Sequence, residues 1–182
     1  MATAFSYPQL KAALWARPDA RVHAVVDAGL VPGLPTQLET AEVNGWDCLR
    51  RGAMAPEAAE RAPYLVDLKD TSAFTDWLLQ EATTTYPGWG LLLVSNRALL
   101  PVREHCRKLG DVITPEGERR AWRWWDPELL QLLLPSFSAS QLDEVFALEQ
   151  AVVLPAAAGW SWHALEQGVL AATLRPLEAA AK

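Results

Sequence analysis

The stretch Arg119–Phe146, which reads RRAWRWWDPELLQLLLPSFSASQLDEVF, decides the fold. Its first part interleaves arginine with tryptophan, a pattern that predicts an extended strand. In such a strand the neighbours Trp124 and Trp125 would point to opposite faces of the sheet. Asp126 and Pro127 then end the strand and begin a helix, because an aspartate side chain caps free backbone N–H groups and a proline needs no partner there.

A pair of helices is expected after this dipeptide. Leucines follow Pro127 at helical spacing, so the first helix should bury one face before Pro135 ends it. Ser138 and Gln141 have the spacing of a capping box and predict the start of a second helix. The unit is therefore a strand, a helix, a tight turn and a helix, and it contains no obvious catalytic group.

Length and composition favour one soluble globular domain. The chain has 182 residues, 51% of them hydrophobic, and a formal net charge of −6. It has no long basic run and no apolar run that would span a bilayer, so neither nucleic acid nor a membrane span is expected. Cys48 and Cys106 lack the spacing of a metal or redox pair, which favours a reducing compartment. No secretion signal is visible, and we expect a cytoplasmic protein.

Extended apolar segments alternate with helical patterns along most of the chain. This alternation predicts an α/β fold, a single domain over residues 1–182 in which helices flank a sheet. A hairpin around residues 115–117 adds antiparallel strands, so we expect a mixed sheet. The core should span about residues 21–150, and the segment 151–182 is variable, with one further strand at 151–154 and then a helix or an ordered strap. The strands predicted before this segment are 21–27, 46–51, 64–68, 89–94, 111–114 and 118–125.

No cofactor or metal site is evident in the sequence. The run Gly88-Trp89-Gly90 lacks a third glycine and precedes a strand, so it fails the dinucleotide fingerprint. The three histidines are scattered without metal-ligand spacing. We therefore expect neither a metal nor a cofactor.

Two weaker candidates for hydrolytic chemistry remain. Ser161 follows Gly159-Trp160 like the start of a nucleophile elbow, but His163 stands where the second glycine is required. Asp27 stands at a strand end, where α/β enzymes often place carboxylates, although turn formation explains it as well. The alternative function is therefore a small hydrolase that uses Asp27 or the Ser161/His163 pair.

Nine tryptophans are an unusually large number for a chain of this length. Tryptophan is highly buried on average, but it is also enriched at binding hot spots. The candidate partner-binding residues are Trp124, Trp125, Trp160, Trp162 and His163, which helix and strand packing does not fully explain. A carbohydrate-binding module with exposed tryptophans as stacking platforms is a third interpretation, which a cytoplasmic location disfavours.

Several short motifs follow one another over roughly residues 21–150. They are Val25-Val26-Asp27-Ala28-Gly29, Cys48-Leu49-Arg50-Arg51-Gly52, Ala62-Pro63-Tyr64-Leu65-Val66, Trp77-Leu78-Leu79, Gly88-Trp89-Gly90 and Arg123-Trp124-Trp125-Asp126-Pro127. With this order and spacing, the sequence resembles the effector-chaperone, or adaptor, family of the bacterial type VI secretion system. Within the motifs we expect Asp126, Pro127, Arg51, Gly52 and Gly90 to have structural roles.

The resemblance implies a cytoplasmic protein without enzymatic activity. Such adaptors bind a cognate toxic effector and hand it to the VgrG spike protein. The segment after residue 150 matches no motif of the family. We therefore hypothesise that this segment contributes the surface that selects the cargo, with Trp160 and Trp162 as its anchors.

Overall fold

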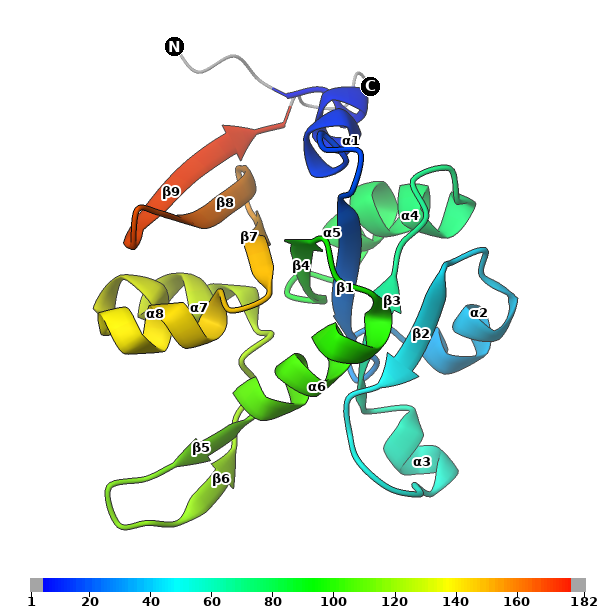
Figure 1. Cartoon of the computed structure of the whole chain (residues 1–182). Coiled ribbons are helices and arrows are strands. Elements are labelled where there is room, and N and C mark those ends of the chain that lie inside the picture. Colours follow the sequence, from blue (N-terminus) through cyan, green and yellow to red (C-terminus); the bar gives the residue numbers. More distant parts are fainter. Residues whose placement is uncertain (1–4, 178–182) are drawn as a thin grey trace.

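The computed structural model describes residues 5–177. A seven-stranded sheet runs through the molecule in the order β2-β3-β1-β4-β7-β8-β9 (Figure 1). Helices pack on both faces of this sheet, so the predicted α/β class is confirmed. Its strands are β1 Arg21–Asp27, β2 Gly45–Cys48, β3 Pro63–Asp67, β4 Gly90–Ser95, β7 Glu149–Ala156, β8 Gly159–Glu166 and β9 Val169–Pro176.

Every ladder between the described strands of this sheet is antiparallel, so the expectation of a mixed sheet was wrong on this point. The chain crosses from β3 to β4 through helices, as in a parallel unit. However, β1 lies between these two strands and runs opposite to both of them. The two strands share a direction without pairing. Sequence patterns predict the helices that connect β3 to β4. They do not show that β1 lies between these two strands in the sheet.

Helices occur along most of the chain. They are α1 Tyr7–Leu14, α2 Leu34–Thr40, α3 Pro56–Ala59, α4 Ala73–Trp77, the π-helical turn η1 Leu78–Ala82, α5 Thr83–Thr85, α6 Leu99–Leu109, α7 Pro127–Leu133, the 3₁₀ turn η2 Leu134–Ser136 and α8 Ala139–Val145. None of the helices within residues 5–177 is long and apolar enough to cross a membrane.

The sheet separates two hydrophobic layers, because side chains alternate between its faces along each strand. On one face, Val22, Ala24 and Val26 of β1 pack against α1, α2 and the α4–η1 helices. On the other face, Val25 and Leu65 pack with α6, α7 and α8. The first and last described residues of the chain also meet, since Phe5 and Leu177 form an isolated bridge.

The strands β5 (Asp111–Ile113) and β6 (Arg119–Ala121) form a separate hairpin that projects from the body of the molecule (Figure 1). The strand predicted to continue to Trp125 was too long. After Ala121 the backbone N–H of Trp122 donates to the carbonyl of Gly110 at 3.1 Å, which draws the chain over the end of α6. Trp124 and Trp125 consequently lie in a turn, and the argument that they face opposite sides of a strand does not apply.

The C-terminal strands β7, β8 and β9 form a meander that continues the main sheet. The strand predicted at 151–154 lies within β7, but the helix or ordered strap expected after it was wrong, because two further strands follow. Alanine-rich segments such as β9 have low intrinsic strand propensity, and pairing with β8 overrides it here. The segment after residue 150 is therefore continuous, in its described part, with the sheet of the preceding core.

Candidate functional site

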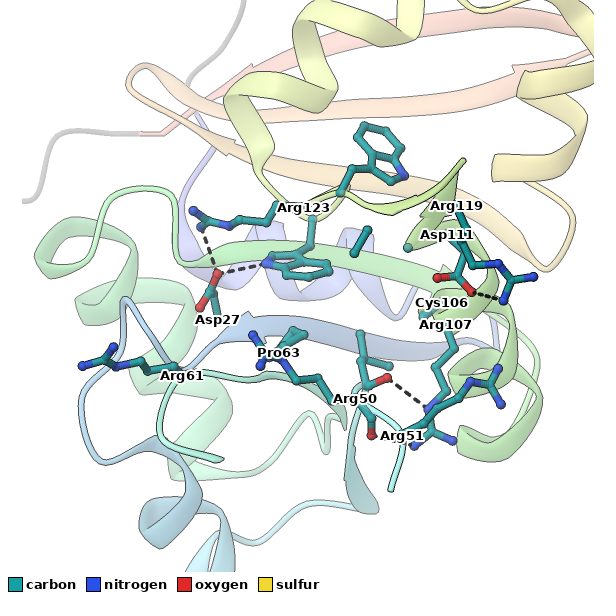
Figure 2. A pocket seen from close by; sticks show the side chains of 15 residues that line it. Asp27, Arg50, Arg51, Arg61, Pro63, Cys106, Arg107, Asp111, Arg119 and Arg123 are labelled. Atoms are coloured by element: carbon teal, nitrogen blue, oxygen red, sulfur yellow. Dashed lines mark hydrogen bonds and ion pairs between the residues drawn. The ribbon is translucent and has the colours of Figure 1, made fainter. Parts of the chain in front are cut away.

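A groove of about 840 Å³ opens at the end of the sheet where β1 ends and β3 begins (Figure 2). Four parts of the chain line it: the end of β1, the loop from β2 toward α3 together with the start of β3, the end of α6, and the hairpin with the segment that follows it. This volume lies within the usual range of ligand pockets. Segments distant in sequence therefore build one concave surface.

One wall of the groove is a short segment, residues 122–125, which we call the tryptophan strap. Its three indole N–H groups all have acceptors: Trp122 donates to the Leu109 carbonyl at 2.6 Å, Trp124 to the Cys106 carbonyl at 3.1 Å and Trp125 to an Asp27 carboxylate oxygen at 3.0 Å. Trp124 is buried, whereas Trp122 and Trp125 are half-buried and line the groove. The strap is thus fixed to α6 and β1 at three points.

Asp27, at the end of β1, is the buried anion of the site, with 6% of its surface exposed. One carboxylate oxygen accepts the backbone N–H of Gly29 at 2.9 Å, which makes the turn after the strand. The other accepts the Trp125 indole and lies 2.9 Å from the Arg123 guanidinium. Each oxygen therefore accepts at least one hydrogen bond from the chain, and Figure 2 shows the Arg123 side chain reaching Asp27.

Arg107 braces the opposite wall. Its guanidinium donates to the carbonyls of Cys48 at 2.7 Å and Leu49 at 3.2 Å, and it also pairs with Glu104 at 3.0 Å. These bonds tie the loop after β2 to α6. The Arg107 guanidinium therefore donates its hydrogen bonds to other parts of the protein and not into the groove.

The other arginines of the groove are exposed and have fewer interactions with the rest of the protein. Arg119 lies 3.6 Å from Asp111, and Arg51 lies 3.5 Å from Glu104. Arg50 and Arg61 have no ion pair with any residue between 5 and 177. Figure 2 shows Arg50, Arg51 and Arg61 on the side of the groove that faces the strap.

The Cys106 thiol also lines the groove, at its base. Burial raises its pKa well above the ordinary value, and the nearby Glu149 carboxylate raises it further. The group therefore stays a neutral thiol at physiological pH and does not act as a nucleophile there. Among the described residues, no three histidine, cysteine, aspartate or glutamate side chains cluster as metal ligands would.

The residues predicted to bind a partner are divided between two places. Trp125 lines the groove, whereas Trp124, its neighbour in the strap, is buried and does not line it. Trp160 lies in the meander and is fully buried, and Trp162 is half-buried with the guanidinium of Arg175 stacked over its ring at 4.1 Å. The structure thus brings the first pair to the groove and places the second pair in a different region.

The Ser161 and His163 side chains do approach one another. Ser161 Oγ lies 2.8 Å from His163 Nε2, because residues two apart in a strand share a face. Both residues are buried, and burial lowers the pKa of His163. His163 Nδ1 has no hydrogen-bond partner within the described residues, so no carboxylate orients the ring as it would in a catalytic triad.

The residues predicted to have structural roles occupy turns, caps and close contacts. Asp126 accepts the backbone N–H groups of Glu128 and Leu129, each at 3.1 Å, and Pro127 occupies the first turn of α7. Gly52 has a positive φ of 81°, which suits a residue without a side chain.

Gly90 starts β4 beside β1, where a Cβ atom would lie 1.8 Å from the carbonyl oxygen of Val25. Arg51 differs from these four residues, because it lines the groove.

Sequence comparison identifies the family of this chain. A family model described as Domain of unknown function (DUF4123) matches residues 22–144, more than half of the chain. The chain belongs to this family. The DUF4123 region runs from β1 to α8 and includes every residue that lines the groove, whereas the meander lies beyond it. No curated protein and no solved structure matches the chain.

Sequence reasoning missed most of the residues that form the DUF4123 groove. The sequence patterns predict no binding role for Arg50, Arg61, Arg107, Arg119 and Arg123, and they indicate Asp27 as a catalytic group or as part of a turn but not as part of a binding surface. The available signal was the recurrence of arginine beside the family motifs, at positions 50–51, 61 and 119–123. These positions are separated by tens of residues, and only the fold brings them to one surface.

Proposed function

We propose that this DUF4123 protein is a cytoplasmic adaptor that binds a cognate type VI secretion effector and promotes its loading onto the VgrG spike protein. The proposal joins the resemblance of the sequence motifs to such adaptors with the chemistry of the groove. It assigns no catalytic role to any residue.

The observation that carries the proposal is the composition of the groove. Six arginines and two half-buried tryptophans line it, and these are residue types that dominate binding energy at protein interfaces. The strap that carries the tryptophans is fixed by three indole hydrogen bonds, so little ordering is needed when a partner binds. A pre-formed basic and aromatic surface suits recognition of another protein.

The arrangement around Asp27 favours binding over catalysis. A catalytic carboxylate needs an oxygen available to the substrate or to a water molecule. In this protein both oxygens accept hydrogen bonds from the chain itself. Asp27 is better explained as the anchor of the strap.

A small hydrolase is the second candidate function, and the short Ser161–His163 contact is the observation that favours it. The pair ranks second because both side chains are buried and lie away from the groove. A folded Ser161→Ala protein should therefore support effector delivery as the wild type does. Loss of delivery together with loss of turnover of an ester substrate by this variant would favour the hydrolase.

Co-purification tests the adaptor directly. The tagged protein, isolated from a strain that encodes it, should elute from a sizing column with the effector encoded beside it, and VgrG should join this complex. Deletion of the gene should stop delivery of that effector and leave other effectors unaffected. Undiminished delivery after deletion, with no effector in the eluate, would contradict the proposal.

A further inference from the structure

The groove is strongly basic although the protein as a whole is acidic. Six arginines and two aspartates line it, which leaves an excess of four positive charges, whereas the chain carries a formal net charge of −6. Like charges gathered on one surface repel one another, and an anionic ligand relieves that repulsion. The excess positive charge of the groove therefore favours the binding of a negatively charged partner there.

The arginines that remain available are distributed along one side of the groove. Arg50 and Arg61 are exposed and have no ion pair within residues 5–177, and the pair between Arg51 and Glu104 is long, at 3.5 Å, with both side chains largely exposed. Arg107 is excluded because its donors are used by backbone carbonyls. The guanidinium groups of Arg50, Arg51 and Arg61 can therefore bind new anionic partners without the loss of a buried hydrogen bond.

Asp27 shows how the groove holds a carboxylate. Its outer oxygen receives one hydrogen bond from an indole N–H and one ion pair from Arg123. The same two residue types occur elsewhere on the lining of the groove, as Arg50, Arg51, Arg61 and the half-buried Trp122. Arginine binds carboxylates through a planar pair of donors, and tryptophan packs against the aliphatic parts of a neighbouring peptide.

We propose that the groove binds an acidic peptide segment of the partner protein, with glutamate or aspartate side chains on Arg50, Arg51 and Arg61 and the intervening chain against Trp122 and Trp125. The assignment deepens the proposed function, since the segment would belong to the effector or to the spike protein. A nucleic acid is the less favoured ligand, because the net negative charge of the chain repels a long polyanion and the groove is confined rather than a track along the surface.

Fluorescence anisotropy with a synthetic probe tests this assignment without the natural partner. The probe is a short fluorescein-labelled peptide that alternates glutamate with alanine, and its matched control has glutamine in place of each glutamate. The acidic peptide should bind at least about tenfold more tightly than the glutamine peptide, and its affinity should fall as salt is raised. Equal binding of the two peptides, or no binding of either, would overturn the proposal.

Matched variants locate the site. The double variant Arg50→Gln/Arg61→Gln should bind the acidic peptide at least about tenfold more weakly, whereas Arg17→Gln/Arg97→Gln removes the same charge from exposed arginines outside the groove and should bind nearly as the wild type does. An equal loss in both variants would show a general charge effect and overturn the assignment. A labelled single-stranded oligonucleotide that binds more tightly than the peptide would also overturn it, in favour of nucleic acid.

The same variants separate this inference from the adaptor function. If Arg50→Gln/Arg61→Gln still co-purifies with the effector and VgrG while the acidic peptide fails to bind the wild type, the adaptor function stands and the groove assignment falls. If the peptide binds as expected but no effector co-purifies with the wild type, the groove assignment stands and the adaptor function falls.

Discussion

The two ends of the β1–β3 pair each bury an aspartate beside an arginine, and the end at Asp27 opens into the groove. Asp67, opposite His23 in the ladder, accepts from Arg21 Nε at 3.0 Å and from the Asn44 amide at 3.3 Å, and 1% of its surface is exposed. Asp27, at the other end, is nearly as buried, but Arg123 is half-exposed at the edge of the groove.

The difference lies in what provides the donors. At the Asp67 end the arginine comes from β1 itself, next to the ladder, so the ion pair closes the end of the sheet. At the Asp27 end the donors come from the tryptophan strap, which reaches β1 from beyond the hairpin and leaves a hollow beneath it. The same pair of residue types therefore lies at a closed end of the strand pair in one case and at the edge of a groove in the other.

The largest effect is expected from Asp67→Ala. The substitution removes a buried carboxylate, so the Arg21 guanidinium loses its ion-pair partner and the Asn44 amide loses one of its two acceptors, and the loss of these hydrogen bonds to a charged group costs about 3 kcal/mol. Urea unfolding should show this loss of unfolding free energy. If Asp67→Ala lowers the unfolding free energy less than Asp27→Ala does, the ion pair at the Asp67 end does not contribute more to stability than the contacts of Asp27.

Acid should weaken the closed end next. Burial lowers the pKa of His23 to about 4, against the raising effect of Asp67, so the folded protein favours the neutral imidazole. The stabilisation is complete above the unfolded value near pH 6.5 and is lost as pH falls toward 4, by about 3 kcal/mol. Unfolding free energies measured across this range should fall more steeply for the wild type than for His23→Phe. Parallel curves would show that His23 does not titrate in this way.

At the open end, Asp27→Ala should cost about 2 kcal/mol, since hydrogen bonds to a charged group are lost but Arg123 can turn to water. The strap should loosen at the same time, which hydrogen exchange of the Trp125 region would detect. Asp27→Asn is the control, because it keeps an acceptor for the Gly29 N–H and should lose less. Unchanged exchange in Asp27→Ala would show that the aspartate does not hold the strap.

The smallest effect is expected just beyond the strap, at the start of α7. Asp126→Ala removes a helix cap, which costs about 1 kcal/mol and should lower the melting temperature by about 2–4 °C. Asp126→Ser retains a side-chain acceptor and should recover most of this loss. Binding of the acidic peptide should stay near the wild-type value in both variants, because the cap faces α7. A loss of peptide binding without a change in melting would place Asp126 in the groove.

Local chemistry made several of these features predictable from the sequence. The Asp126-Pro127 cap, the glycine turn at position 52 and most of the strands through β4 depend on neighbouring residues, so pattern and propensity are enough to find them. The α/β class follows from their alternation.

Features that depend on distant contacts were not predictable. The antiparallel sheet results from the insertion of β1 between β3 and β4, and the course of the strap results from a hydrogen bond between Trp122 and Gly110. The groove was missed for the same reason, because Arg50, Arg61 and Arg123 meet only in the folded chain. Tryptophan content alone was a poor guide, since Trp160 and Trp125 both have another tryptophan close by in the sequence, yet Trp160 lies in the core.

The central position of β1 has a consequence for how the chain folds as it is synthesised. β1 emerges from the ribosome before both of its neighbours, and β4, which completes its pairing, is made only after the whole β3 crossover. Until then the edge of β1 that pairs with β4 lacks its partner, and such long-range pairing is slow and exposed to aggregation. The segment between β1 and β4 is therefore the part of the nascent chain during whose synthesis aggregation is most to be expected.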